Sequence, residues 1–204
     1  MKTEPLVKGN YYHIYNRGNN GTDLFLENEN YSHFLRLYEK YINPVADTFA
    51  WCLMKNHFHI LVYLKEDQEI NIKELSYSTV ESPKEINHSK QFSHLFNSYT
   101  QAINKRYDRT GSLFEKPFER KLVSSEKYFN NLVYYIHHNP VHHGFVDKIS
   151  EYPWSSYDTM ISIKPTKLKR EKIIENFDSL ENFIYYHNKE HDLEEIKDLL
   201  IDII

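Results

Sequence analysis

Cysteine is almost missing from this chain of 204 residues, in which Cys52 is the single example. One cysteine excludes an internal disulfide and a zinc site built from the cysteines of one chain, and it fits a reducing cytoplasm. Long apolar runs are also missing, since runs such as residues 60–64 are far too short to cross a bilayer. The first ten residues lack the apolar core of a signal peptide. We therefore expect a cytoplasmic protein without membrane contact.

The composition indicates a folded chain, because 40% of the residues are hydrophobic and 26% are charged. Its length suffices for one domain with a core and an appendage. We expect a main domain over residues 1–160 and a helical C-terminal extension over residues 161–204, whose role the sequence does not reveal.

The net charge of −4 argues weakly against a nucleic-acid partner, but its distribution matters more. Residues 161–204 carry three more acidic than basic side chains, which can hide a basic working face elsewhere. Residues 101–127 show the reverse, with four acidic side chains and seven basic ones: Lys105, Arg106, Arg109, Lys116, Arg120, Lys121 and Lys127. The plainer alternative is that both stretches are solvated surface.

Periodicity and turn signals predict the order of the elements. Strands are expected over residues 11–17, 49–54, 58–64 and 118–123, and helices over 30–42, 92–107 and 126–139. The last of these helices should be capped by Ser125 and end before Pro140. A short helix near residues 72–75 lies in a polar loop, and one or two further helices after residue 167 join near 187–191. This order predicts an α+β fold with a mainly antiparallel central sheet flanked by helices.

Two histidines begin one of the predicted strands, as His57-Phe58-His59. Alternate residues of a strand share a face, so His57 and His59 should project together into a cleft while Phe58 enters the core. Two imidazoles on a rigid strand suit a divalent cation. Taken alone, the triplet is more typical of a solvated strand face.

The helix over residues 126–139 contains two adjacent tyrosines. Its buried stripe follows Phe129, Leu132, Val133 and Ile136. At about 100° per residue, Tyr135 lies on the flank of that stripe and Tyr134 points almost directly outward. Asn139, four residues after Tyr135, falls on the same flank. An ordinary boundary tyrosine remains the alternative, because the chain has 17 tyrosines.

These segments together resemble a known family. The blocks YYHIYNRG, FAWCLMKNHFHILV, FNSYTQAINKRYDRTGSLFE, YYIHHNPVHHGFV and EYPWSSY are similar, in this order, to the IS200-like tyrosine transposases, and most of all to the REP-associated branch. The resemblance covers residues 11–157. It implies a ferredoxin-like fold of the HUH endonuclease kind, with Tyr135 as nucleophile and His57, His59 and Asn139 as metal ligands. The chain departs from the family after Asn-Pro-Val, where it has His142-His143.

The resemblance also implies a reaction. A tyrosine hydroxyl has an ordinary pKa near 10 and needs a polarised target at neutral pH. A divalent metal, Mg²⁺ or Mn²⁺, would polarise the scissile phosphate, and a 5′-phosphotyrosine would conserve the energy of the broken bond for strand transfer. The expected partner is single-stranded or hairpin DNA, and the enzyme would be nucleoid-associated while bound to it. The sequence leaves open whether the protein is a monomer or a homodimer.

Basic side chains are expected to guide this DNA toward Tyr135. Tyr107 and Phe114 are candidates for stacking on bases. The expected DNA-binding residues are Arg17, Lys55, Lys105, Arg106, Arg109, Lys116, Arg120 and Lys121.

Three other functions remain open at this point. The chain could be a DNA-binding protein, specific for a sequence or a hairpin, without cleavage activity. It could also be a metal-dependent phosphodiesterase that uses water as its nucleophile. Replication initiators and relaxases share the same histidine pair, although their tyrosine usually has other sequence neighbours.

Overall fold

A four-stranded antiparallel sheet forms the centre of the computed structural model, which describes residues 5–71, 75, 86–189 and 191. Its strands are β1 (Tyr11–Arg17), β2 (Ala46–Leu53), β3 (His57–Leu64) and β4 (Glu119–Val123), in the spatial order β2-β3-β1-β4. Helix α1 (Asn28–Tyr41) follows β1, and α2 (His88–Arg106) connects β3 to β4. This arrangement is the ferredoxin-like β-α-β-β-α-β unit, so the predicted fold class is confirmed.

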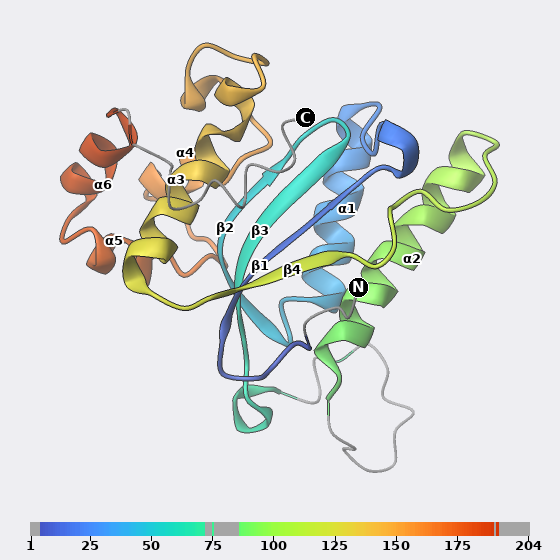
Figure 1. Ribbon diagram of the computed structural model, residues 1–204, viewed down its shortest axis with the longest axis horizontal. Helices are drawn as coiled ribbons and strands as arrows, with labels where there is room; N and C mark the ends of the chain where they lie inside the picture. The colour runs from blue at the N-terminus through green and yellow to red at the C-terminus, as the bar shows by residue number, and fades with distance from the viewer. Residues whose placement is uncertain (1–4, 72–74, 76–85, 190, 192–204) are drawn as a thin grey trace.

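Helices cover both faces of the sheet (Figure 1). Helices α1 and α2 lie on one face, where Phe34 and Phe96 pack against Phe58. Helix α3 (Glu126–His142) lies on the other face, where Leu132 and Ile136 belong to a second core. Because both faces are covered, every residue of β3 except Tyr63 is buried, although the strand contains two histidines.

Helix α3 continues through Pro140, whereas the sequence predicted that it ends before this proline. Proline lacks the N–H of the helical ladder and disfavours a helical residue before it. The helix survives because Pro140 is buried in its last turn, where the amides of His143 and Phe145 still bond the Asn139 and Pro140 carbonyls at 3.0 and 2.9 Å. Gly144, with φ of +68°, follows the helix end. Asn139 is therefore helical, one turn after Tyr135.

In the part of the chain that the structure describes, three short α-helices follow α3: α4 (Tyr157–Ile161), α5 (Arg170–Asn176) and α6 (Leu180–His187). Helix α6 ends at His187, within the junction predicted near 187–191, and whether a further helix follows lies outside the described residues. The sequence did not predict the break between α5 and α6 at 177–179, where Asp178 has a φ of +64° and Ser179 caps α6. Phe183 and His187 of α6 pack on Tyr157 and on His137 of α3. Of the helix predicted near 72–75, only residue 75 is among the described residues, so its outcome lies outside them.

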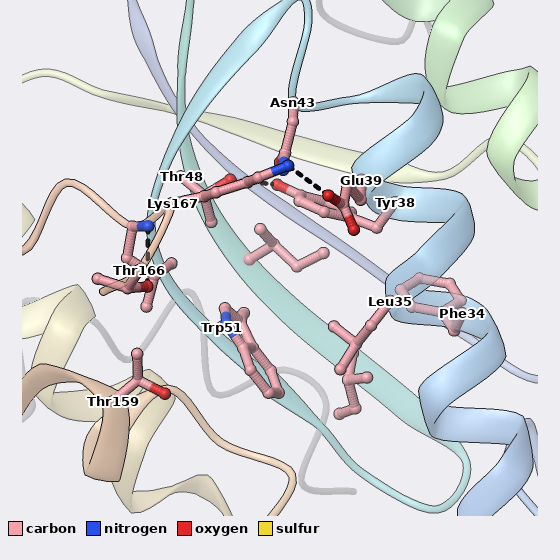
Figure 2. A pocket seen from close by; sticks show the side chains of 13 residues that line it. Phe34, Leu35, Tyr38, Glu39, Asn43, Thr48, Trp51, Thr159, Thr166 and Lys167 are labelled. Carbon is pink, nitrogen blue, oxygen red and sulfur yellow. Dashed lines mark hydrogen bonds and ion pairs between the residues drawn. The ribbon is translucent and has the colours of Figure 1, made fainter. Parts of the chain in front are cut away.

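The segment after α3 covers the outer edge of β2. Backbone amides of Leu53, Ser156 and Lys169 bond the carbonyls of Trp154, Trp51 and Thr48, each at 2.9 Å. This cover satisfies groups that an edge strand would otherwise expose. A cavity of about 200 Å³ remains between α1, β2 and this segment, with Trp51 in its wall. The Lys167 ammonium reaches across it to the Glu39 carboxylate (Figure 2).

Candidate active site

His57 and His59 project from β3 toward α3, and Phe58 projects into the opposite core, as the alternation predicted. The two imidazole centroids are 5.2 Å apart. Strand β3 lies inside the sheet, where His59 faces Tyr15 of β1 on one side and Cys52 of β2 on the other. The backbone that carries both histidines is therefore fixed by strands on its two sides.

The structure corrects the expectation that these histidines face a cleft. His57 is 7% exposed and His59 is 0% exposed, because α3 lies against this part of the sheet. Burial lowers the pKa of His57 to about 4, against the opposing effect of its hydrogen bond to Asn139, and it holds the pKa of His59 well below the ordinary value. Both rings are therefore neutral at pH 7, which is the form that binds a metal.

Helix α3 brings Tyr135 and Asn139 to this histidine pair. The helix begins at the predicted cap, where the Ser125 hydroxyl accepts a hydrogen bond from the Tyr128 amide. Asn139 places its Oδ1 3.0 Å from Nε2 of His57, and the Tyr135 ring lies 5.3 Å from the His59 ring. Two elements that are far apart in the sequence thus bring the four predicted side chains together.

The surroundings of the two tyrosines differ from the predicted ones. Tyr135 is 0% exposed instead of lying at the rim of a cleft, and Tyr134 is 4% exposed instead of pointing to solvent. The ring of Tyr134 meets Tyr186 of α6 at 5.8 Å and His191 at 4.7 Å. A helical-wheel prediction assumes that a helix buries a single face. It failed for Tyr134 because α6 also covers the face of α3 that points away from the sheet.

The hydrogen bonds of His57 and His59 leave ring nitrogens that could bind a cation. The ring nitrogens of His57 lie 2.8 Å from Asn56 Oδ1 and 3.0 Å from Asn139 Oδ1, but a neutral imidazole has one N–H for these two oxygens. Among the residues that the structure describes, none is a hydrogen-bond partner for the buried Nε2 of His59. Rotating the Asn139 amide would resolve the conflict at His57 and still leave the His59 nitrogen alone.

This donor set is small. Within residues 5–71, 75, 86–189 and 191, no three His, Cys, Asp or Glu side chains are placed to hold a metal ion together. Two imidazole nitrogens and an amide oxygen would be the protein ligands, with the remaining positions left for water or substrate oxygens. The residues therefore fit a divalent cation that also binds a phosphate.

Sequence reasoning missed two histidines at the site. His13 of β1 is buried against His59, with Nε2 2.9 Å from Nδ1 of His59. His143, after the end of α3, has its ring 4.9 Å from that of His57. The register of β1 against β3 would have revealed His13, because Tyr15 opposes His59 and His13 is two residues away on the same face.

The structure divides the predicted DNA-binding residues among several places. Arg17 and Lys121 lie on the sheet face of His57, since they are opposite His57 and His13 in the ladder. Lys116 and Arg120 line a groove on the opposite face. Lys105, Arg106 and Arg109 lie at the far end of α2, and Lys55 pairs with Asp23 at 3.0 Å.

The two predicted stacking aromatics are engaged elsewhere. Phe114 is a core residue that is 4% exposed, and its ring lies 5.1 Å from that of Phe96. The Tyr107 hydroxyl bonds the Glu27 carboxylate, which also receives the Arg106 guanidinium at 2.6 Å. Burial therefore prevents Phe114 from stacking on a base, whereas the Tyr107 ring is half-buried and fixed at its hydroxyl end.

Comparisons with known proteins support the resemblance. No protein-family model matches the chain. A protein of Haemophilus influenzae (strain Rd), named as a REP-associated tyrosine transposase, is 28% identical over 115 residues, which are 54% of this chain. The chain thus spans little more than half, 58%, of the length of this relative.

A solved structure of a REP-associated tyrosine transposase bound to a REP hairpin superposes with a TM-score of 0.60 at 17% identity, over 81% of this chain and 88% of that one. It shows the same fold. A bacterial tRNA(His) guanylyltransferase-like protein in complex with GTP has a TM-score of 0.38 at 11% identity, over 70% and 71% of the two chains, which is too low to carry an argument. The resemblance inferred from the motifs is confirmed.

Proposed function

We propose, from its confirmed resemblance to the REP-associated tyrosine transposases, that this chain cuts and rejoins single-stranded or hairpin DNA with Tyr135 as the nucleophile. A divalent cation, Mg²⁺ or Mn²⁺, would be held by His57, His59 and Asn139. One observation carries the proposal: Asn139 of α3 lies 3.0 Å from His57 of β3, with the Tyr135 ring beside His59. The relative of known structure is bound to a REP hairpin, which suggests the class of DNA.

The proposed reaction is a phosphoryl transfer. The Tyr135 oxygen forms a bond to the scissile phosphorus, the bond from phosphorus to the 3′ oxygen breaks, and the DNA 5′ end stays on the tyrosine. The phenol loses its proton and the departing 3′ oxygen gains one. A bound divalent cation supplies charge stabilisation on the phosphate. A 3′ hydroxyl can then attack the phosphotyrosine, which restores Tyr135 and joins the strands.

The electrostatics of the site favour an anionic substrate. The pKa of His57 is lowered, after burial, by His143 and Arg17, which are cationic or become so on protonation. His57, His59 and Asn139 are themselves neutral, so a bound cation keeps its full charge for the phosphate. Arg17 lies at the end of β1 on the same face, where its guanidinium is half exposed and pairs with Glu115 at 2.8 Å. Arg17 and Lys121 are the proposed contacts to the DNA backbone on this face.

A DNA-binding protein without cleavage activity is the second candidate, and the burial of Tyr135 favours it. With an exposed fraction of 0%, the phenol can reach a phosphate only after neighbouring side chains move. The exposed ring of His142, 6.3 Å from the Tyr135 ring, is one such neighbour. Cleavage therefore requires a conformational step that DNA or metal binding would have to induce.

One experiment separates these functions. The protein is incubated with single-stranded DNA from the flanks of its own gene, with Mg²⁺, with Mn²⁺ or with EDTA, and resolved on a denaturing gel. A metal-dependent covalent protein–DNA band supports the proposal. A nick without an adduct indicates an enzyme that uses water. A mobility shift on a native gel, with neither nick nor adduct, supports the binding protein.

A further inference from the structure

A second imidazole lies directly behind the proposed ligand His59. His13, on the inner strand β1, is 0% exposed, and its ring meets that of His59 edge to edge, with centroids 5.1 Å apart and planes inclined by only 22°. Nε2 of His13 is 2.9 Å from Nδ1 of His59. The ring of Tyr15 stacks on His13 at 4.7 Å, so neighbouring aromatic rings fix its orientation.

The hydrogen bond between the two rings can run in either direction, and the directions have different consequences. If His13 donates, Nε2 of His59 carries a proton and cannot bind a cation. If His59 donates from Nδ1, its Nε2 presents a lone pair. Among the described residues, both that nitrogen and Nδ1 of His13 are buried without a hydrogen-bond partner, so either direction leaves one N–H of the two rings unbonded, and only the second direction leaves Nε2 of His59 open to a cation. The second direction therefore prepares His59 as a ligand.

We propose that His13 is a positioning residue for the metal site: it accepts a hydrogen bond from Nδ1 of His59 and so directs the unprotonated Nε2 of His59 toward the cation. The inference rests on the proposed function, because it concerns the same metal site. Residues behind a ligand histidine orient its ring and fix its tautomer, and their loss weakens metal binding.

The chemistry of this acceptor is unusual. Ligand histidines commonly donate to a carboxylate, a backbone carbonyl or water, whereas His13 offers a neutral ring nitrogen. Lys121 of β4 is opposite His13 in the ladder and adds positive charge on this face. A neutral acceptor adds no negative charge to the ligand set, so the cation remains a stronger Lewis acid for the phosphate.

The first test measures Mn²⁺ affinity by titration calorimetry on the full chain in a Tyr135→Phe background without DNA. We expect His13→Leu to weaken binding by about 10–100-fold, the usual loss for a residue behind a metal ligand. His13→Gln keeps an acceptor oxygen and should recover most of that affinity. His88→Leu is the matched control, because His88 is also buried but sits on α2, on the other face of the sheet.

The outcomes separate the existence of the metal site from the role of His13 in it. Absence of Mn²⁺ binding by the Tyr135→Phe parent and the unsubstituted protein contradicts the proposed metal site and, with it, the role of His13. Parent-like affinity in a folded His13→Leu variant overturns the inference and leaves the metal site standing. A similar loss of affinity in His13→Gln and His13→Leu also overturns it, since the hydrogen bond would then be irrelevant.

A second measurement needs no substitution. In ¹⁵N-labelled protein saturated with diamagnetic Mg²⁺, we expect the shared proton on Nδ1 of His59, with a through-hydrogen-bond coupling to Nε2 of His13. Finding that proton on Nε2 of His13 in the Mg²⁺-loaded protein would overturn the inference. This readout reports the tautomer directly, whatever the effect of the variants on folding.

Discussion

Tyr134 and Tyr135 are neighbours in the sequence with different surroundings. The Tyr135 ring lies beside His59, whereas Tyr134 packs on α6. We expect Tyr135→Phe to abolish the covalent DNA adduct while leaving DNA affinity nearly unchanged, because the nucleophilic oxygen is lost and the ring is kept. Tyr134→Phe is the matched control and should still form the adduct on a denaturing gel. Adduct formation by the Tyr135 variant but not by the Tyr134 variant would show that the wrong tyrosine was assigned.

Phe58 and His57 separate packing from metal binding. Phe58 is fully buried against Phe34 and Phe96, so Phe58→Ala should lower the free energy of unfolding by about 3–5 kcal/mol. His57→Ala should cost less, about 1–3 kcal/mol for a lost buried hydrogen bond, and it should abolish Mn²⁺ binding. Urea unfolding and calorimetry measure the two effects. A larger loss of stability in His57→Ala than in Phe58→Ala would contradict the assignment of the two sheet faces.

Helix α6 is linked to α3 and β2 by a chain of buried hydrogen bonds. His187 donates from Nδ1 to the Phe183 carbonyl at 2.8 Å, so its Nε2 must accept from Nδ1 of His137 at 3.0 Å. Nε2 of His137 then accepts from the Ser156 hydroxyl at 2.8 Å, whose oxygen accepts from the Trp51 amide at 2.9 Å. The C-terminal helices are thereby fastened to the helix that carries Tyr135.

Removing the serine tests this chain. Ser156→Ala leaves the buried His137 ring and the Trp51 amide without their partner, so we expect the free energy of unfolding to fall by about 1–3 kcal/mol. Ser93→Ala, at an exposed position of α2, is the control and should stay within about 0.5 kcal/mol of the parent. Equal stabilities of the two variants in urea would mean that the chain of hydrogen bonds contributes little.

Strand β4 presents adjacent cations on its two faces. Lys121 lies on the face of the proposed active site, and Arg120 lies over the Phe118 ring at 3.9 Å on the other face. We expect Lys121→Gln to weaken binding of single-stranded DNA and to flatten the slope of log affinity against log salt by about 0.7, the value for one phosphate contact. Arg120→Gln should leave that slope unchanged. The opposite result would place the DNA on the α2 face.

Several histidines of the whole molecule are buried in the neutral form. Burial lowers the pKa of His13 and His187 to about 3 and that of His57 and His138 to about 4, from an ordinary value of 6.5. Between pH 6.5 and these lowered pKa values, the four histidines are protonated in the unfolded chain and neutral in the folded one. Their contribution to stability is therefore fully present above pH 6.5 and falls as the pH drops toward 4.

Each such histidine should lower the free energy of unfolding by about 1.4 kcal/mol per pH unit in this window. Urea unfolding of the metal-free protein at pH 7.5, 6.0 and 5.0 measures the sum. A free energy of unfolding that stays constant down to pH 5.0 would show that these rings are protonated in the folded protein. Saturating Mg²⁺ or Mn²⁺ should raise the free energy of unfolding at all three pH values without changing this slope, because His57 and His59 are already unprotonated in the folded protein at these pH values.

The sequence by itself determined the order of the strands and helices of the main domain. It also placed the two histidines of the site on one strand and Tyr135 and Asn139 on one helix. Alternation placed His57 and His59 together and Phe58 opposite, and helical spacing placed Tyr135 with Asn139, because both periods are properties of the backbone. The bounds of β1 and the Ser125 cap were predicted correctly, since aromatic and β-branched residues and a serine cap act locally.

Only the tertiary structure decided what covers these residues. That Tyr134 and Tyr135 are both buried follows from α6 packing on one side of α3 and the sheet on the other, and no local pattern reports a partner so distant in sequence. Helix α3 also continues through Pro140, which is buried in its last turn, so the local preference of proline did not decide where the helix ends. The contact between His13 and His59 follows from the register of β1 against β3. Register is a long-range pairing that decides which side chains touch, and the sequence leaves it open until the strands are aligned.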